Sequence, residues 1–415
     1  MLARYRKVIA EFPKTFWVVV ITSFIDGVGG TLLFPFFALY ITERFAVGMA
    51  TAGVLLGLSS LFGLAGSMLG GALTDRFGRR RLILFGLIFS ALSALAFGLV
   101  SSLSLLYPVI AVVGLLSSVA HPAHNAMVAD LLPEEKRQEG FGILRVVGNL
   151  AWIIGPSIGG FVAARSFFAL FVIDATVSCV VAAIVFRLIP ETRPRHLETA
   201  HGQSLVETFR GYAAVSRDRA FMAFLAASIL MLIVYQQMYN SLSVYLRDSH
   251  GINPRGYGLL LTTSAIVVVL LQFWVSRRIK IRPPFLMMVV GALFYMVGFG
   301  MFGVVATYPL FLLAIIIVTV GEMIVVPTSQ ALAAHFAPEE MRGRYMAAFG
   351  LSWTIPATLG PGVAGYILDH FNPNLLWLGG GVLCLASAIS FLALHTRLGL
   401  QPQFAGRLSE ASTEA

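Results

Sequence analysis

GALTDRFGRRR, residues 71–81, is a short basic segment that separates two long apolar stretches. The stretch before it (51–71) and the stretch after it (82–100) carry no charged side chain, and each is long enough to cross a bilayer core of about 30 Å. Inside lipid, every backbone amide has to be bonded within its own segment, so such stretches form helices. The sequence therefore predicts a tight polar connection between two membrane-spanning helices.

The composition extends this prediction to the whole chain. Of the 415 residues, 58% are hydrophobic and 12% are charged, whereas soluble domains carry about 25% charged residues. The net charge of +9 would suit nucleic acid, but the basic residues are spread over short connections, so we expect no nucleic-acid partner. None of the four lysines follows a glycine, which excludes the usual phosphate-binding loop. We find no nucleophile constellation and no metal-ligand set, and we expect neither an enzyme nor a cofactor.

Twelve helices account for the apolar segments of the chain. We expect them near residues 15–41, 51–71, 81–100, 105–129, 140–164, 167–189, 220–246, 256–276, 285–305, 308–334, 344–368 and 375–395. If the N-terminus is cytoplasmic, the cytoplasmic connections hold 24 of the 29 Lys and Arg residues, the outer connections hold 4, and Arg145 lies within a helix. The bias places both termini in the cytoplasm. Short loops and the lack of an Asn-x-Ser/Thr site favour a bacterial inner membrane.

An internal repeat with an offset of 205 residues divides the chain into two halves. PEEKR at 133–137 recurs as PEEMR at 338–342, and Gly155-Pro156 recurs as Gly360-Pro361. We therefore expect an all-α membrane fold of two six-helix bundles, 1–189 and 220–396. A polar cytoplasmic linker (190–219) joins them, and a cytoplasmic tail (397–415) follows. Transporters place their substrate site between such repeats.

The 71–81 segment resembles the signature loop of the major facilitator superfamily, and the similarity extends over most of the chain. The resemblance implies a conformational gate formed by Gly71, Asp75, Arg76, Gly78, Arg79 and Arg80. Asp130 ends the fourth predicted helix on the same side and could complete a charge relay with these arginines. A simple interfacial acid is the alternative for Asp130.

The fifth predicted helix carries a second motif. Gly155, Pro156, Gly159 and Gly160 resemble the motif of the antiporter branch of this superfamily, with Ala151 in place of its first glycine. Proline bends a helix and glycines allow close packing, so a packing motif without directional meaning is the alternative.

Two acids lie inside predicted spans, Asp26 in the first helix and Glu322 in the tenth. A charged acid at mid-membrane costs about 2.5–3.5 kcal/mol on the insertion scale, so such residues usually mark ion paths. Both surrounding sequences resemble those of drug:proton antiporters, which implies proton coupling, or cation recognition in the case of Glu322. A protonated acid with a structural role is the alternative.

Polar and aromatic residues at helical spacing accompany these acids on five helices, and we expect them to line a common substrate cavity. They are Phe37, Tyr40, His121, His124, Asn125, Arg145, Asn149, Trp152, Gln236, Tyr239, Asn240, Ser329 and Gln330. Because Arg145 stays charged, it requires either a carboxylate, for which Asp26 is the candidate, or an anionic substrate. The histidines could titrate or act as neutral hydrogen-bonding groups.

These features predict a proton-driven exporter of small amphipathic or drug-like molecules, working as a monomer in the lipid bilayer. Its energy source would be the proton gradient. One alternative is an exporter or flippase of one endogenous lipid, glycolipid or sugar. Another is a membrane sensor that has the same fold and transports nothing.

Overall fold

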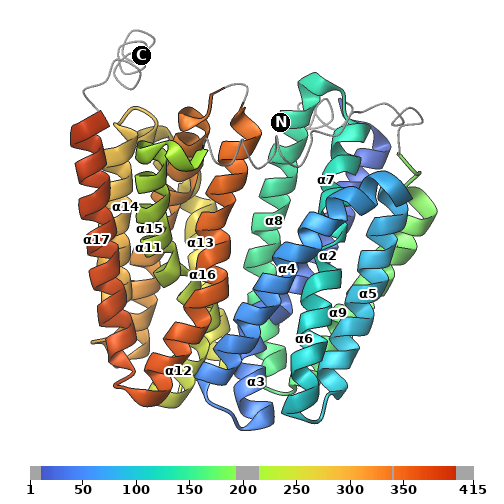
Figure 1. Ribbon diagram of the computed structural model, residues 1–415. Coiled ribbons are helices and arrows are strands. Elements are labelled where there is room, and N and C mark those ends of the chain that lie inside the picture. Colours follow the sequence, from blue (N-terminus) through green and yellow to red (C-terminus); the bar gives the residue numbers. More distant parts are fainter. Residues whose placement is uncertain (1–10, 193–214, 339–340, 399–415) are drawn as a thin grey trace. The chain divides into compact units, whose positions relative to one another are not determined.

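The structure, a computed structural model, describes residues 11–192, 215–338 and 341–398, and within these ranges it contains helices and no strand. The expected linker (190–219) and tail (397–415) fall mostly outside the described residues. The chain divides by its contacts into two units (Figure 1). Unit 1 comprises Met1–Val47, Leu55–Ala200 and Ile252–Thr262, and unit 2 comprises Gly48–Val54, His201–Gly251 and Thr263–Ala415.

The described residues of the first half of the chain form eight α-helices and one 3-10 turn. They are α2 (Lys14–Leu33), η1 (Phe34–Phe36), α3 (Phe37–Phe45), α4 (Met49–Phe77), α5 (Arg79–Leu99), α6 (Leu103–Ser117), α7 (Ala120–Leu131), α8 (Glu134–Ala163) and α9 (Phe167–Leu188). The second half forms α11 (Arg219–Asn240), α12 (Leu242–His250), α13 (Pro254–Ile279), α14 (Pro284–Phe302), α15 (Tyr308–Phe336), α16 (Arg342–His370) and α17 (Asn374–Leu398).

Eleven segments of the described chain are long and apolar enough to cross a membrane. The helix missing from this set is α16, which has 29 residues but includes Pro356, Pro361 and several polar side chains. The membrane class and the helical fold are thus confirmed. Of the twelve expected spans, eleven have a matching segment that is long and apolar enough to cross a membrane.

Three predicted helices are interrupted. The first predicted helix ends at Leu33 and continues as α3 after the 3-10 turn that contains Pro35, because proline removes a backbone donor and bends the chain. The fourth breaks at Ser118, a few residues before Pro122, and so divides into α6 and α7. The seventh, 220–246, breaks at Ser241 and so divides into α11 and α12. All three predicted segments are present, but none of them is one continuous helix.

The repeat predicted from the sequence is present in three dimensions. The bounds of α3 and α12 differ by 205 residues, and α15 matches the combined span of α6 and α7 at the same offset. Within unit 1 the Tyr40 hydroxyl donates to the Phe97 carbonyl (2.5 Å), and within unit 2 the Tyr245 hydroxyl donates to the Phe302 carbonyl (2.8 Å). Packing repeats as well, since α2 contacts α8 and α9 as α11 contacts α16 and α17.

Candidate functional site

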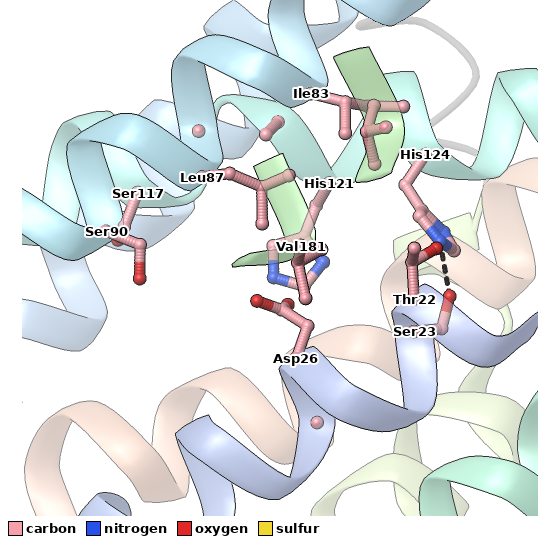
Figure 2. Close-up of a pocket in the computed structure, with 14 residues that line it drawn as sticks. Thr22, Ser23, Asp26, Ile83, Leu87, Ser90, Ser117, His121, His124 and Val181 are labelled. Atoms are coloured by element: carbon pink, nitrogen blue, oxygen red, sulfur yellow. Dashed lines mark hydrogen bonds between the residues drawn. The ribbon is translucent and has the colours of Figure 1, made fainter. Parts of the chain in front are cut away.

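A cavity of about 390 Å³ lies inside unit 1, between α2, α5, α7 and α9 (Figure 2). Its lining is mixed: apolar side chains alternate with hydroxyls, two imidazoles and one carboxylate. The lining residues are Thr22, Ser23, Asp26, Gly27, Ile83, Gly86, Leu87, Ser90, Ser117, Ala120, His121, His124, Val181 and Val185. A volume of this size is within the range of small-molecule pockets.

Asp26 and the two histidines project into this cavity (Figure 2). Asp26 is exposed there although it lies near the middle of the apolar helix α2. His124 is fixed by a hydrogen bond between its Nε2 and the Ser23 hydroxyl (2.9 Å), whereas the side chain of His121 is exposed. The structure therefore brings together three of the residues that the sequence singled out.

A third acid in the spans, Asp174, was missed at the sequence level. It lies in α9, is only 8% exposed, and contacts the backbone of α2 at Gly29. Its signal is the same as that of Asp26, a carboxyl within an apolar run, so a complete search of the apolar segments would have found it.

The 71–81 segment forms an ion-paired cluster at the junction of α4 and α5. Arg79 is buried, and its Nε donates to the Asp130 carboxylate at 2.9 Å. Asp130 also accepts a hydrogen bond from the Thr192 hydroxyl (3.2 Å). The predicted pairing of Asp130 with Arg79 is present, while the exposed Arg76 lies over the neighbouring Phe77 ring.

Glu191 is a further member of this cluster that the sequence reading missed. Its carboxylate accepts the backbone N–H of Arg79 at 2.8 Å and so caps the first turn of α5. Gly78 precedes this turn with φ +90, and a Cβ there would lie 2.6 Å from the Glu191 carboxylate. The Arg80 guanidinium lies over the Phe186 ring and donates to the Phe186 carbonyl. A glutamate 112 residues away in sequence offers no local signal for this contact.

The remaining residues of the predicted gate are Gly71 and Asp75. Gly71 lies within α4 with no neighbouring atom in reach of a Cβ, and the side chain of Asp75 lies outside the described atoms.

The glycine motif of α8 makes close helix contacts. A Cβ on Gly155 would lie 2.0 Å from the Thr31 hydroxyl, and one on Gly159 would lie 2.3 Å from the Leu32 carbonyl. Gly160 packs against the first turn of α13, where a Cβ would lie 2.8 Å from the Pro254 carbonyl. Pro156 lies inside α8. The motif therefore holds α8 against α2, the helix that carries Asp26.

In unit 2, Glu322 lies among tyrosines. Tyr235 lies beside its carboxyl, contacts Tyr239 (hydroxyl oxygens 3.2 Å apart) and stacks on Tyr295 (5.6 Å between centroids). The Trp353 ring lies edge-on to Tyr235 at 6.0 Å. An acid surrounded by aromatic faces can attract a cation both by charge and by the ring quadrupoles.

The other expected lining residues lie outside the unit 1 cavity. Phe37 and Tyr40 join Phe97 and Phe171 in an aromatic cluster, and Trp152 packs edge-on against Phe34. Asn125, Arg145 and Asn149 are exposed without lining it. In unit 2 the Asn240 amide bonds to the Gln236 carbonyl, Ser329 bonds within its own helix, and Gln330 is half-buried. Each unit is described by itself, so the common cavity stays a prediction.

Among the described residues, no group of three or more His, Cys, Asp or Glu side chains is arranged to hold a metal ion. Asp26, His121 and His124 line one cavity but are therefore not arranged as a set of metal ligands.

The family model of the Major Facilitator Superfamily matches this chain over residues 19–361 and 324–407. The chain belongs to the major facilitator superfamily. Among its relatives in this superfamily is the "Na(+), Li(+), K(+)/H(+) antiporter" of Planococcus maritimus, 27% identical over 380 residues, which is 85% of this chain and 89% of the relative. The "Multidrug resistance protein MdtH" of Shigella dysenteriae is 22% identical over 402 residues, 95% of this chain and 96% of that protein.

Solved structures of major facilitator proteins share the fold. The nucleoside transporter NupG superimposes with a TM-score of 0.79 at 13% identity, covering 92% of this chain and 100% of that one. A POT family transporter in complex with 5-aminolevulinic acid gives 0.78 at 16% identity, covering 93% and 96%. The chain is thus a transporter of this superfamily by family and fold.

Proposed function

We propose that this major facilitator protein is a proton-coupled exporter of small amphipathic or drug-like compounds that works by alternating access. The observation that carries the proposal is Asp26, a carboxyl at the middle of an apolar helix and exposed inside a cavity. An acid in such a place is costly and usually marks an ion path. A multidrug resistance protein among the relatives supports the choice of substrate.

The two acids have different surroundings, and we assign them different roles. Asp26, among hydroxyls and imidazoles, would bind and release the proton. Glu322, beside Tyr235 and among aromatic rings, would bind a proton or the positive group of a lipophilic substrate. In this proposal the chain acts as a monomer in a bacterial inner membrane with both termini cytoplasmic, without a cofactor, and the proton gradient supplies the energy.

A second candidate function is the exchange of alkali cations for protons. The relative from Planococcus maritimus is named for that activity. The hydroxyls of Ser23, Ser90 and Ser117 line the same cavity as Asp26, and hard cations prefer such oxygen ligands.

Purified protein in liposomes loaded with a pH-sensitive dye tests both functions. A proton gradient is imposed, and tetraphenylphosphonium, a neutral drug, a sugar, sodium and potassium are added in turn. We expect tetraphenylphosphonium to evoke proton flux, and we expect Asp26→Asn and Glu322→Gln to abolish it, while Asp248→Asn, which removes an exposed acid paired with Arg247, leaves it unchanged. Flux evoked by sodium or potassium alone would favour the second candidate, and no flux with any compound would refute proton antiport.

A further inference from the structure

Asp174 is a buried carboxyl that the proposed transport mechanism has not yet used. It lies in the first half of α9 and is 8% exposed. Within the described part of the chain it has no hydrogen bond or ion pair. A carboxylate buried in a membrane span without a partner is costly, so its position needs a physical reason.

Asp174 faces the side of α2 that carries Asp26. A Cβ built on Gly29 would lie 2.9 Å from the Asp174 Oδ1, so the carboxyl lies directly against α2 where a side chain is missing. Asp26 precedes Gly29 by three residues and therefore lies on the same side of the helix, about one turn away.

Asp174 does not itself line the cavity that contains Asp26. Ser178 follows it by one turn on α9, is 1% exposed, and its hydroxyl lies 3.3 Å from that of Ser90. Ser90 lines the cavity. Asp26 is therefore the acid that reaches the cavity in this structure, and Asp174 is the acid behind the cavity wall.

Few other charged groups are near this pair. Lys14 is the only other charged residue of α2, and the charged residues of α5 are the three arginines at its start. On α8 no charged residue follows Arg145, and α9 adds only Arg187 at its end. The titratable neighbours on α7 are His121 and His124, which line the same cavity as Asp26.

We propose that Asp26 and Asp174 form one site that binds a single proton between two carboxyls. Two like charges at this depth are much more costly than one, so the pair holds one proton and one negative charge. Transfer breaks the O–H bond on one carboxyl and forms it on the other, so the net charge of the pair stays the same. Asp26 exchanges the proton with the cavity, and Asp174 keeps it away from the cavity. This inference rests on the proposed proton coupling.

Infrared spectroscopy of the purified protein in lipid nanodiscs tests the pair without any substrate. The C=O band of protonated carboxyl groups is followed during a pH titration of the wild type and of Asp26→Asn, Asp174→Asn and the double variant. We expect the carboxyl that remains in each single variant to titrate at least about one pH unit away from its transition in the wild type, because coupled acids respond to each other. Identical transitions in the wild type and the single variants would overturn the proposal.

Two further variants guard against a merely structural effect. Gly29→Ala keeps both acids but places a methyl group where the Asp174 carboxyl lies, so it should change the coupled titration. Thr176→Val alters an exposed residue of α9 that bonds only to its own helix, and it should leave the titration unchanged. If the two carboxyls titrate as a coupled pair but no compound evokes proton flux in liposomes, the proposed transport function is refuted and the shared proton site stands. If compound-evoked proton flux has the same pH profile in Asp174→Asn as in the wild type, the shared proton site is refuted while proton-coupled transport stands.

Discussion

Replacing Asp130 by asparagine tests whether the ion pair with Arg79 holds the junction of α4 and α5 together. The Arg79 side chain is 7% exposed and that of Asp130 is 23% exposed. Removing one partner of a buried pair costs about 3–5 kcal/mol, because the other charge stays buried without its counterion. Arg79 keeps a long contact to the Thr74 carbonyl (3.5 Å), and Asp130 is partly solvated, so we expect a smaller cost than this, about 2–3 kcal/mol.

The expected readout is the midpoint of thermal unfolding in detergent. A cost of this size corresponds to a decrease of roughly 5–10 °C for a unit of 150–250 residues. The double variant with Arg79→Gln should be little worse than Asp130→Asn alone, because both substitutions remove the same ion pair. Asp248→Asn is the matched control: Asp248 pairs with Arg247 at 2.7 Å but is 57% exposed, so its loss should cost well under about 1 kcal/mol.

Two results would refute this reasoning. A midpoint for Asp130→Asn within about 2 °C of the wild type would mean that the pair contributes no more than a surface ion pair. Strict additivity in the double variant would mean that the two side chains act independently, despite the 2.9 Å between Nε and Oδ2.

Three further substitutions have expected outcomes. Gly155→Ala should destabilise the protein by about 1–3 kcal/mol in thermal unfolding, because the added Cβ would lie 2.0 Å from the Thr31 hydroxyl and 2.9 Å from a backbone nitrogen of α2. Gly148→Ala is the control: this glycine has open space around it, so the substitution should be neutral or stabilising. Asp369→Ala should cost about 1 kcal/mol and speed amide exchange at the start of α4, because its carboxylate accepts the first two amides of that helix at 2.8 Å each. Burial lowers the pKa of His250 below its usual 6.5, so the unfolded chain binds more protons than the folded protein, and stability should fall as the pH drops below 6.5. The prediction would be contradicted if the unfolding midpoint of His250→Phe decreased with pH as much as that of the wild type.

The fold was predictable because its signals are local and repeated. Long apolar runs with few charges predict helices in lipid, and the 205-residue offset predicted two similar bundles. The interruption of the first helix was also readable in principle from Pro35, but a proline within a membrane helix often bends the helix without ending it, so the sequence left both outcomes open. The membrane class did not depend on this detail.

The candidate site was only partly predictable, for a different physical reason. Asp26, His121 and His124 were found because helical spacing places polar residues on one face, and the structure brings them into one cavity. Glu191 was missed because its role as the cap of α5 depends on how α9 ends beside α5, which no local pattern encodes. Spacing likewise cannot distinguish a residue that lines a cavity from one that packs. Tyr40, for example, packs in an aromatic cluster and also lines a second pocket of unit 1, while its place in the common cavity stays a prediction.

The repeat itself indicates which buried polar groups serve the fold and which serve chemistry. The hydroxyl-to-carbonyl bond of Tyr40 has an equivalent in Tyr245, so this contact belongs to the scaffold of each unit. The three acids have no such equivalents: 205 residues away stand Met231 for Asp26, Gly379 for Asp174 and Ser117 for Glu322. The same helix arrangement therefore forms without a carboxyl at these positions. Since each carboxyl costs free energy in a membrane span, this difference supports the proposed role of the acids in proton binding, and replacing them by amides should remove that binding while the helices stay packed.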